Sequence, residues 1–202
     1  MNLDPLSLPV RERYQLLIST ILPRPIAWVS TVSPDGVPNL APFSFFTGIA
    51  ANPMSVCFAP VNDREGRKKD TLVNVEKTRQ FVVNLAGEAN AEKMNRTSAP
   101  FPYGVSEFEK AGVTPLPSVK VKPPRVKETL ASLECELIQI VTLAEGPLGG
   151  NLVIGKVVHF HCDDSVWNDG KIRHQDLKNV GRMEGAWYAR TTDAFELPRP
   201  EL

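Results

Sequence analysis

Four basic residues stand just before a predicted helix, and their position could create a binding site for an anion. The group comprises Arg64, Arg67, Lys68 and Lys69, and Asp70-Thr71 follows at once. A helix N-terminus has free backbone N–H groups and the positive end of the helix dipole, so it attracts phosphate groups. Arg67 or Lys69 could neutralise a phosphate and Thr71 could donate its hydroxyl, while Asp70 caps the helix from the side. The same residues could instead form a solvated charged loop, and spacing alone does not separate the two interpretations.

A second segment, residues 39–47, combines aromatic and polar side chains on a strand that proline interrupts. It reads NLAPFSFFT. Because Pro42 has no N–H to give to a sheet, local pairing is broken there and backbone groups could face a ligand. Phe45 and Phe46 beside Asn39, Ser44 and Thr47 suit a flat ring with an apolar end and a hydrogen-bonding edge. Alternatively, the segment is an ordinary strand that is half core and half surface.

The elements that would position these residues are mostly short strands. We expect strands at 26–32, 37–46, 54–59, 80–85, 133–141 and 152–162, and helices at 8–21, 70–77, 88–96 and 106–112. The turn Ser33-Pro34-Asp35-Gly36 makes a hairpin of the first two strands, and Pro38 and Pro42 place the second at a sheet edge or a bulge. No strand alternates regularly with a long helix, and no linker divides the chain. These features predict a mainly β single domain over residues 1–202, an antiparallel barrel or sandwich with peripheral helices.

Composition limits the classes of partner. The chain has 202 residues, and 23 basic residues balance 23 acidic ones, which argues against nucleic-acid binding. No apolar run reaches the length of a membrane span, and the first residues lack the apolar core of a signal peptide. Cys57, Cys135 and Cys162 show no disulfide or zinc spacing. A reducing, cytoplasmic setting without membrane or nucleic-acid partners is therefore expected.

Two histidines and several absent motifs narrow the chemistry further. His159 and His161 would point to one face of a strand, but a metal needs a further ligand and none is visible in the sequence. We therefore expect a surface or interface pair and predict no metal site. The Walker A, GxGxxG, GxSxG and HExxH patterns are absent, so a Rossmann nucleotide site and the common hydrolase sites are not indicated.

Several short motifs follow one another in order over most of the chain. They are Pro23-Arg24-Pro25, Val29-Ser30-Thr31, Asn39 to Phe46, Asn52-Pro53, Lys69-Asp70-Thr71 with Asn74, Phe81 to Leu85, Gly155 to Val158, Val180-Gly181-Arg182, Tyr188 and Arg199-Pro200. Each is weak alone, but in this order they resemble the flavin reductase-like family, the FMN-binding split-barrel proteins that include flavoredoxins. Lys68 and residues 98–125 depart from the family pattern, and the second departure could alter a substrate-facing loop.

The resemblance implies a six-stranded antiparallel Greek-key split β-barrel flanked by helices, and a homodimer that binds FMN near its interface. Arg67, Lys69 and Thr71 would hold the phosphate, Arg182 and Tyr188 would close the site, and Asn84 belongs to the same cofactor-binding set. The isoalloxazine ring and ribityl chain would lie along Asn39, Ala41, Pro42, Phe43, Ser44, Phe45, Phe46 and Thr47.

The chemistry that the resemblance implies requires no catalytic side chain, because the flavin itself accepts hydride and releases electrons. Our first hypothesis is an NAD(P)H-dependent flavin oxidoreductase that passes electrons to a free flavin, a metal chelate or a partner protein. A second is an FMN electron carrier of the flavoredoxin kind that does not oxidise NAD(P)H. A third is a flavin-free barrel with a structural or interaction role.

Overall fold

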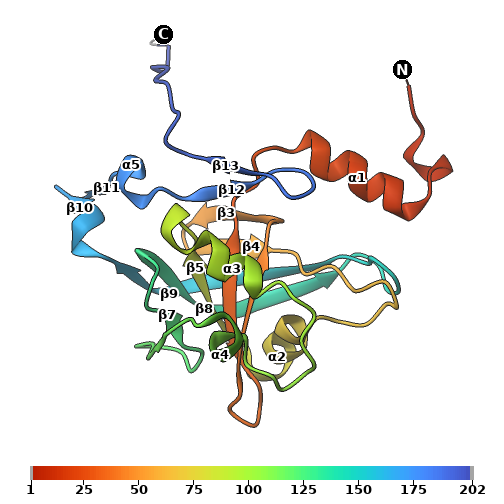
Figure 1. Cartoon of the computed structure of the whole chain (residues 1–202), viewed down its shortest axis with the longest axis horizontal. Helices are drawn as coiled ribbons and strands as arrows, with labels where there is room; N and C mark the ends of the chain where they lie inside the picture. Colours follow the sequence, from red (N-terminus) through yellow and green to blue (C-terminus); the bar gives the residue numbers. More distant parts are fainter. Residues whose placement is uncertain (1, 201–202) are drawn as a thin grey trace.

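Seven antiparallel strands form the main sheet of the computed structural model, which describes residues 2–200. Their order across the sheet is β2-β1-β5-β8-β9-β4-β3, and Figure 1 shows them packed at the centre of the molecule. Their bounds are β1 Ala27–Val32, β2 Pro38–Phe43, β3 Phe46–Ala51, β4 Met54–Phe58, β5 Gln80–Leu85, β8 Ala131–Thr142 and β9 Asn151–Cys162. The predicted strands are all present, and the turn at Ser33–Gly36 joins β1 to β2 through a Gly36 N–H bond to the Ser33 carbonyl.

The two edges of this sheet are consecutive in the chain. β2 and β3 lie at opposite ends of the strand order, yet only Ser44 and Phe45 separate them. β2 is therefore an edge strand, as its prolines predicted, because within residues 2–200 no strand pairs with the side of β2 that faces away from β1. Six strands were expected and the sheet has seven, since the chain bends after Phe43 and starts a new strand at Phe46.

Alternation along the strands separates two apolar cores. Ala27 and Val29 of β1 face an interior core with Phe58, Phe81 and other buried residues. Trp28, between them, faces the other side, where it packs with residues such as Leu40. Successive side chains of a strand point to opposite faces, so one strand contributes to both cores.

Helices close the interior and cover the outer core. α2 (Asp70–Thr78) inserts Leu72 and Val75 into the interior core. α3 (Ala91–Arg96) and α4 (Glu107–Ala111) bring Met94 and Phe108 to the outer core. The remaining helical segments are η1 Pro5–Ser7, α1 Val10–Thr20, η2 Glu88–Asn90, η3 Asp164–Val166 and α5 His174–Leu177, and the two-stranded pairs are β6 Pro115–Leu116 with β7 Arg125–Val126, β10 Trp167–Asn168 with β11 Lys171–Ile172, and β12 Val180–Arg182 with β13 Tyr188–Arg190.

Two helix predictions need correction in detail. α1 forms where expected, but Val10, Tyr14 and Leu17, whose spacing of four and three residues is typical of a buried helix face, are exposed, and the helix buries only Ile18. α2 begins one residue earlier than the predicted cap implies, so Lys69 is the N-cap and Asp70 lies in the first turn. None of the described helices is long and apolar enough to cross a membrane.

Candidate functional site

A cavity of about 160 Å³ opens where the bend between β2 and β3 meets α3 and the β12–β13 hairpin. We call it the Ser44 cavity. Its apolar lining residues are Ile26, Pro42 and Met94. Its polar and cationic lining residues are Ser44, Asn95, Ser98, Arg182 and Tyr188. The structure thus brings together four of the residues that the sequence predicted for the cofactor, two from the β2–β3 segment and two from near the C-terminus.

Hydrogen bonds and stacking organise the polar wall of the Ser44 cavity. The Tyr188 hydroxyl donates to Asn95 Oδ1 at 3.1 Å, and the Arg182 guanidinium carbon lies 4.6 Å from the centre of the Tyr188 ring. This cation–π contact and the phenolic hydrogen bond fix the ring between β12–β13 and α3. The Ser44 hydroxyl is held in place by Arg24, whose Nε donates a hydrogen bond to Ser44 Oγ at 3.3 Å.

A second cavity of about 210 Å³ adjoins the first, and Ile26 belongs to both. We call it the Phe46 cavity. Its wall is mostly apolar and is formed by Pro23, Pro25, Ile26, Phe46, Leu85, Ala86, Asn179, Val180, Gly181 and Thr191. Together, the two cavities form a region with an apolar end and a hydrogen-bonding end, which is the arrangement that a flat heteroaromatic ring needs.

The residues from 39 to 47 are distributed over several environments. Ala41 pairs with Val29 of the interior core, and Phe43 packs against Phe58 with ring centres 5.3 Å apart. Phe45 contacts Tyr14 of α1, and Thr47 is exposed on β3. Pro42 and Ser44 line the Ser44 cavity and Phe46 lines the Phe46 cavity, so only part of this segment faces the cavities.

Asn39 lies at the other end of β2, in a buried polar network above α2. Its Nδ2 donates to Thr71 Oγ1 at 2.9 Å and to Thr31 Oγ1 at 3.3 Å, and Asn74 donates to the same Thr31 oxygen. Thr71 is buried and its hydroxyl accepts from Asn39, so this side chain links β2 to α2 in the present structure. The five steps of extended chain from Asn39 to Ser44 span about 17 Å, so Asn39 near the start of β2 and Ser44 just after its end are well separated.

The N-terminus of α2 keeps its backbone donors free of side-chain caps. Lys69 occupies the N-cap position without a capping hydrogen bond, and its side chain is exposed. Asp70 in the first turn is partly buried, and burial raises its pKa. An exposed ammonium and uncapped N–H groups at the end of a nine-residue helix can attract an anion.

Arg67 is already engaged by acidic neighbours. Its Nε lies 2.7 Å from Asp63 Oδ2 and its Nη2 lies 2.9 Å from Glu65 Oε2. Partial burial of Asp63 opposes ionisation, but the hydrogen bonds from Arg67 and the backbone outweigh it and lower the pKa of Asp63 to about 2. The charge of Arg67 is therefore compensated in this loop, whereas that of Lys69 is not part of any ion pair in residues 2–200.

Asn84 lies away from both cavities, in a buried network with no spare capacity. Its Nδ2 donates to the Trp28 carbonyl at 3.0 Å and approaches Ser30 Oγ at 3.5 Å. Its Oδ1 accepts from the Val126 N–H and from Ser132 Oγ, both at 2.9 Å. The structure therefore gives Asn84 a role in joining β1, β5, β7 and β8, and does not bring it to the cavity wall.

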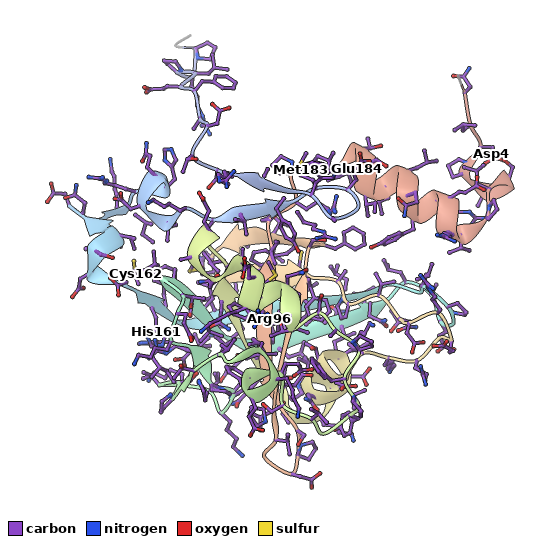
Figure 2. All side chains as sticks on the ribbon, in the orientation of Figure 1. Asp4, Arg96, His161, Cys162, Met183 and Glu184 are labelled. Atoms are coloured by element: carbon purple, nitrogen blue, oxygen red, sulfur yellow. The ribbon has the colours of Figure 1, made fainter. Side chains whose placement is uncertain are left out.

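The histidine pair lies on β9 and lines neither cavity, and Figure 2 shows His161 below and to the left of Met183. His159 and His161 rings are 4.5 Å apart, and His161 Nε2 contacts the buried Glu134 carboxylate at 2.5 Å. No group of three or more His, Cys, Asp or Glu residues suited to a metal occurs within residues 2–200. All three cysteines are free.

Sequence reasoning missed Arg24, Met94, Asn95 and Ser98 as neighbours of the cavity. Arg24 offered one signal, an arginine between two prolines just before a strand, because such a residue is rigidly placed. The three residues from α3 and the turn after it offered none, since nothing local says that α3 packs beside β12.

Comparison with known proteins fits this geometry. A family model described as the flavin reductase-like domain matches residues 19–175. The chain belongs to the flavin reductase-like family. Membership supports a flavin cofactor and an oxidoreductase function in general terms, and it confirms the resemblance seen in the motifs.

Solved structures agree over nearly the whole chain. The Bacillus cereus nitrilotriacetate monooxygenase component B superposes with a TM-score of 0.93 at 35% identity, and the match covers 98% of each chain. The Pseudomonas fluorescens 2-nitrobenzoate 2-nitroreductase NbaA gives 0.89 at 29% identity over 99% of this chain and 96% of its own. A Shewanella frigidimarina protein described as a flavin reductase with a split-barrel domain gives 0.82 at 25% identity, with 97% and 96% covered. The split-barrel type of fold is thereby confirmed, while the expected count of six strands is not.

Proposed function

We propose that this protein binds FMN and is an NAD(P)H-dependent oxidoreductase that passes electrons to a small molecule or a partner protein. The observation that carries the proposal is the convergence of Pro42 and Ser44 with Arg182 and Tyr188 on one cavity. Two similar structures support an oxidoreductase, since they are named as a monooxygenase component and a nitroreductase.

The cofactor would use both ends of β2. Phe46 and the apolar wall of the Phe46 cavity would hold the isoalloxazine ring, and Pro42 and Ser44 would contact its edge where the Ser44 cavity begins. Lys69 and the first-turn N–H groups of α2 would hold the phosphate. Thr71 would support this site through Asn39 rather than by its own hydroxyl, and Arg67 would add charge only after release from Asp63.

The side chains around the ring would bind and orient rather than exchange protons. When bound, a flavin can accept hydride and release electrons singly or in pairs. Among the lining residues of the Ser44 cavity there is no carboxylate and no histidine, so no general acid or base is assigned. Arg24 and Arg182 give this end of the site a positive charge, which stabilises negative charge that develops on a bound group.

One experiment separates the proposed function from its two alternatives. The purified protein is titrated with FMN, its visible spectrum is recorded, and NADH or NADPH is added without oxygen. Bleaching of bound flavin by either nucleotide is expected for the oxidoreductase. Bound flavin that bleaches only with a chemical reductant would favour the electron carrier, and no FMN binding would favour the flavin-free barrel.

We also propose that the protein forms a homodimer in the cytoplasm. β3 is an edge strand, and all of its residues after Phe46 are exposed, including Ile49. An edge with an exposed apolar residue is a natural pairing surface. Sedimentation of the wild type should give a dimer and Ile49→Asp should shift it towards monomer. The control Ile138→Asp changes an equally exposed residue on β8, and an equal shift in both variants would contradict an interface at β3.

A further inference from the structure

Arg24 is a buried cation that has no acidic partner within residues 2–200. Its side chain is only 4% exposed. The guanidinium donates to the carbonyl oxygens of Ile18, Ile21 and Met183 and to Ser44 Oγ. These contacts satisfy its hydrogen bonds and join α1, the β2–β3 bend and the β12–β13 loop; Figure 2 shows Met183 beside the end of α1. None of them is a carboxylate, so the hydrogen bonds leave the positive charge in place.

Arg182 adds a second cation next to the first. The backbones of Arg24 and Arg182 form a bridge, with N–H to carbonyl distances of 3.0 and 2.8 Å. Arg182 stacks on Tyr188 and donates to the Gly185 carbonyl, and within the described chain it has no ion pair. Burial lowers the pKa of Arg24, Tyr14 opposes this effect, and the nearby charge of Arg182 adds to the lowering. Two like charges are therefore placed together, and within residues 2–200 no carboxylate forms an ion pair with either of them.

The residues that line the cavity beside these cations suit an organic anion. Arg182 lies on its wall, and Arg24 lies behind the Ser44 hydroxyl. Asn95 and Ser98 supply further polar groups, while Met94 and Pro42 supply apolar surface. Coulomb attraction is stronger where water is partly excluded, so an anion here gains more than it would on an open surface.

We propose that the Ser44 cavity recognises the carboxylate of a small organic acid with an apolar part, which is the second substrate of this site. Arg182 would bind the carboxylate directly, and Arg24 would contribute a fixed buried charge through Ser44. The assignment rests on the proposed function, because it places this acid beside bound FMN. The cations would hold the carboxylate, and Ile26, Pro42 and Met94 would contact the apolar part of the acid.

The test measures binding of benzoate and of benzamide, its uncharged counterpart of the same shape, by isothermal titration calorimetry. With flavin-free protein, benzoate should bind at least about ten-fold more tightly than benzamide, as expected for a charge-assisted hydrogen bond. Arg182→Gln should weaken benzoate about ten-fold and leave benzamide unchanged, and Arg182→Lys should restore part of the loss.

A matched control lies on the same hairpin. Arg190→Gln removes the same charge from β13, but Arg190 is exposed, pairs with Glu88 at 2.9 Å and does not line the cavity. Its benzoate affinity should equal that of the wild type. Equal binding of benzoate and benzamide, no binding of benzoate, or equal losses in Arg182→Gln and Arg190→Gln would each overturn the proposal. Circular dichroism of both variants shows whether the fold is retained.

Loading with FMN distinguishes a substrate anion from an anionic part of the cofactor. Benzoate should still bind to FMN-loaded protein with its preference over benzamide intact. Loss of benzoate binding on loading would assign the cations to the cofactor and overturn the proposal. If FMN itself fails to bind, the proposed function fails, while the comparison of benzoate with benzamide on flavin-free protein still decides whether the cavity prefers an anion.

Discussion

Glu134 and Arg24 are both buried, at 0% and 4% exposure, but the groups that surround the two charges differ. The Glu134 carboxylate accepts from the backbone N–H groups of Val119, Lys120 and Val121 and contacts His161. In the described part of the chain, Arg24 donates its hydrogen bonds to neutral oxygens alone, and it lies near the charge of Arg182 beside a cavity. A buried charge with complementary partners serves the fold, whereas one left uncompensated at a cavity wall is a candidate for binding a ligand.

The largest expected effect comes from removing the Glu134 carboxylate, the buried charge that has hydrogen-bond partners. Glu134→Ala should lower the free energy of unfolding by about 3–5 kcal/mol, because three loop N–H groups and His161 lose their acceptor. Urea denaturation measures this, and the exposed neighbour Glu136→Ala should stay within about 0.5 kcal/mol of wild type. Similar stability of the two variants would contradict the structural role given to Glu134.

Asn84→Ala tests whether Asn84, whose amide already makes all its hydrogen bonds within the protein, also contributes to the cofactor site. We expect a loss of about 2–3 kcal/mol in unfolding free energy, because buried donors and acceptors on three strands lose their partners. The FMN affinity of the folded protein should be unchanged. The control is Asn168→Ala, which changes an exposed asparagine. If FMN affinity falls in Asn84→Ala and not in the control, Asn84 contributes to the cofactor site after all.

Lys69→Ala tests the positive charge at the N-terminus of α2, which lies near the Asn39 end of β2 and forms no ion pair in residues 2–200. FMN binding should weaken by about 1–2 kcal/mol, because an exposed ammonium at the α2 N-terminus no longer meets the phosphate. Fluorescence titration with FMN and with riboflavin measures the effect, and riboflavin binding should not change. Lys77→Ala, in the last turn of the same helix, is the control, and equal losses would indicate only general electrostatic attraction.

The smallest effect is the pH dependence of the Glu134 contribution. Burial opposes ionisation of Glu134, but hydrogen bonds from His161 and the loop N–H groups outweigh it and lower its pKa below 4.5. A lowered folded-state pKa gives stabilisation that is present above the unfolded pKa and is lost as the pH falls through the folded value. The stability gap between wild type and Glu134→Gln should therefore be wider at about pH 7 than at about pH 4. A gap that stays constant over this range would contradict ionisation as its source.

The fold was largely predictable because its signals are local. The prolines of β2, the turn at Ser33–Gly36 and the β-branched runs each depend on neighbouring residues. β3 was missed because the bend at Ser44–Phe45 leaves no turn signal, and the exposure of Leu17 on α1 could not be read from a pattern that is usually buried.

The site was only partly predictable because its contacts are non-local. Arg24 donates to a carbonyl 159 residues later in the chain, and no spacing rule connects two such positions. The motifs named Arg182 and Tyr188 through the family resemblance, but their proximity to Asn95 depends on the packing of α3. Asn84 lies in the same strand as buried core residues, and only its hydrogen bonds show where its amide is used.

The bridge between Arg24 and Arg182 can form only late in synthesis of the protein, because its two residues lie near opposite ends of the chain. All strands of the main sheet precede residue 163, whereas the hairpin that walls the Ser44 cavity follows residue 179. A nascent chain emerges from the ribosome N-terminus first, and domains begin to fold as it does so. A polypeptide released before Arg182 would therefore have every strand of the barrel but an open flank, with the Arg24 side chain uncovered where Met183 should lie.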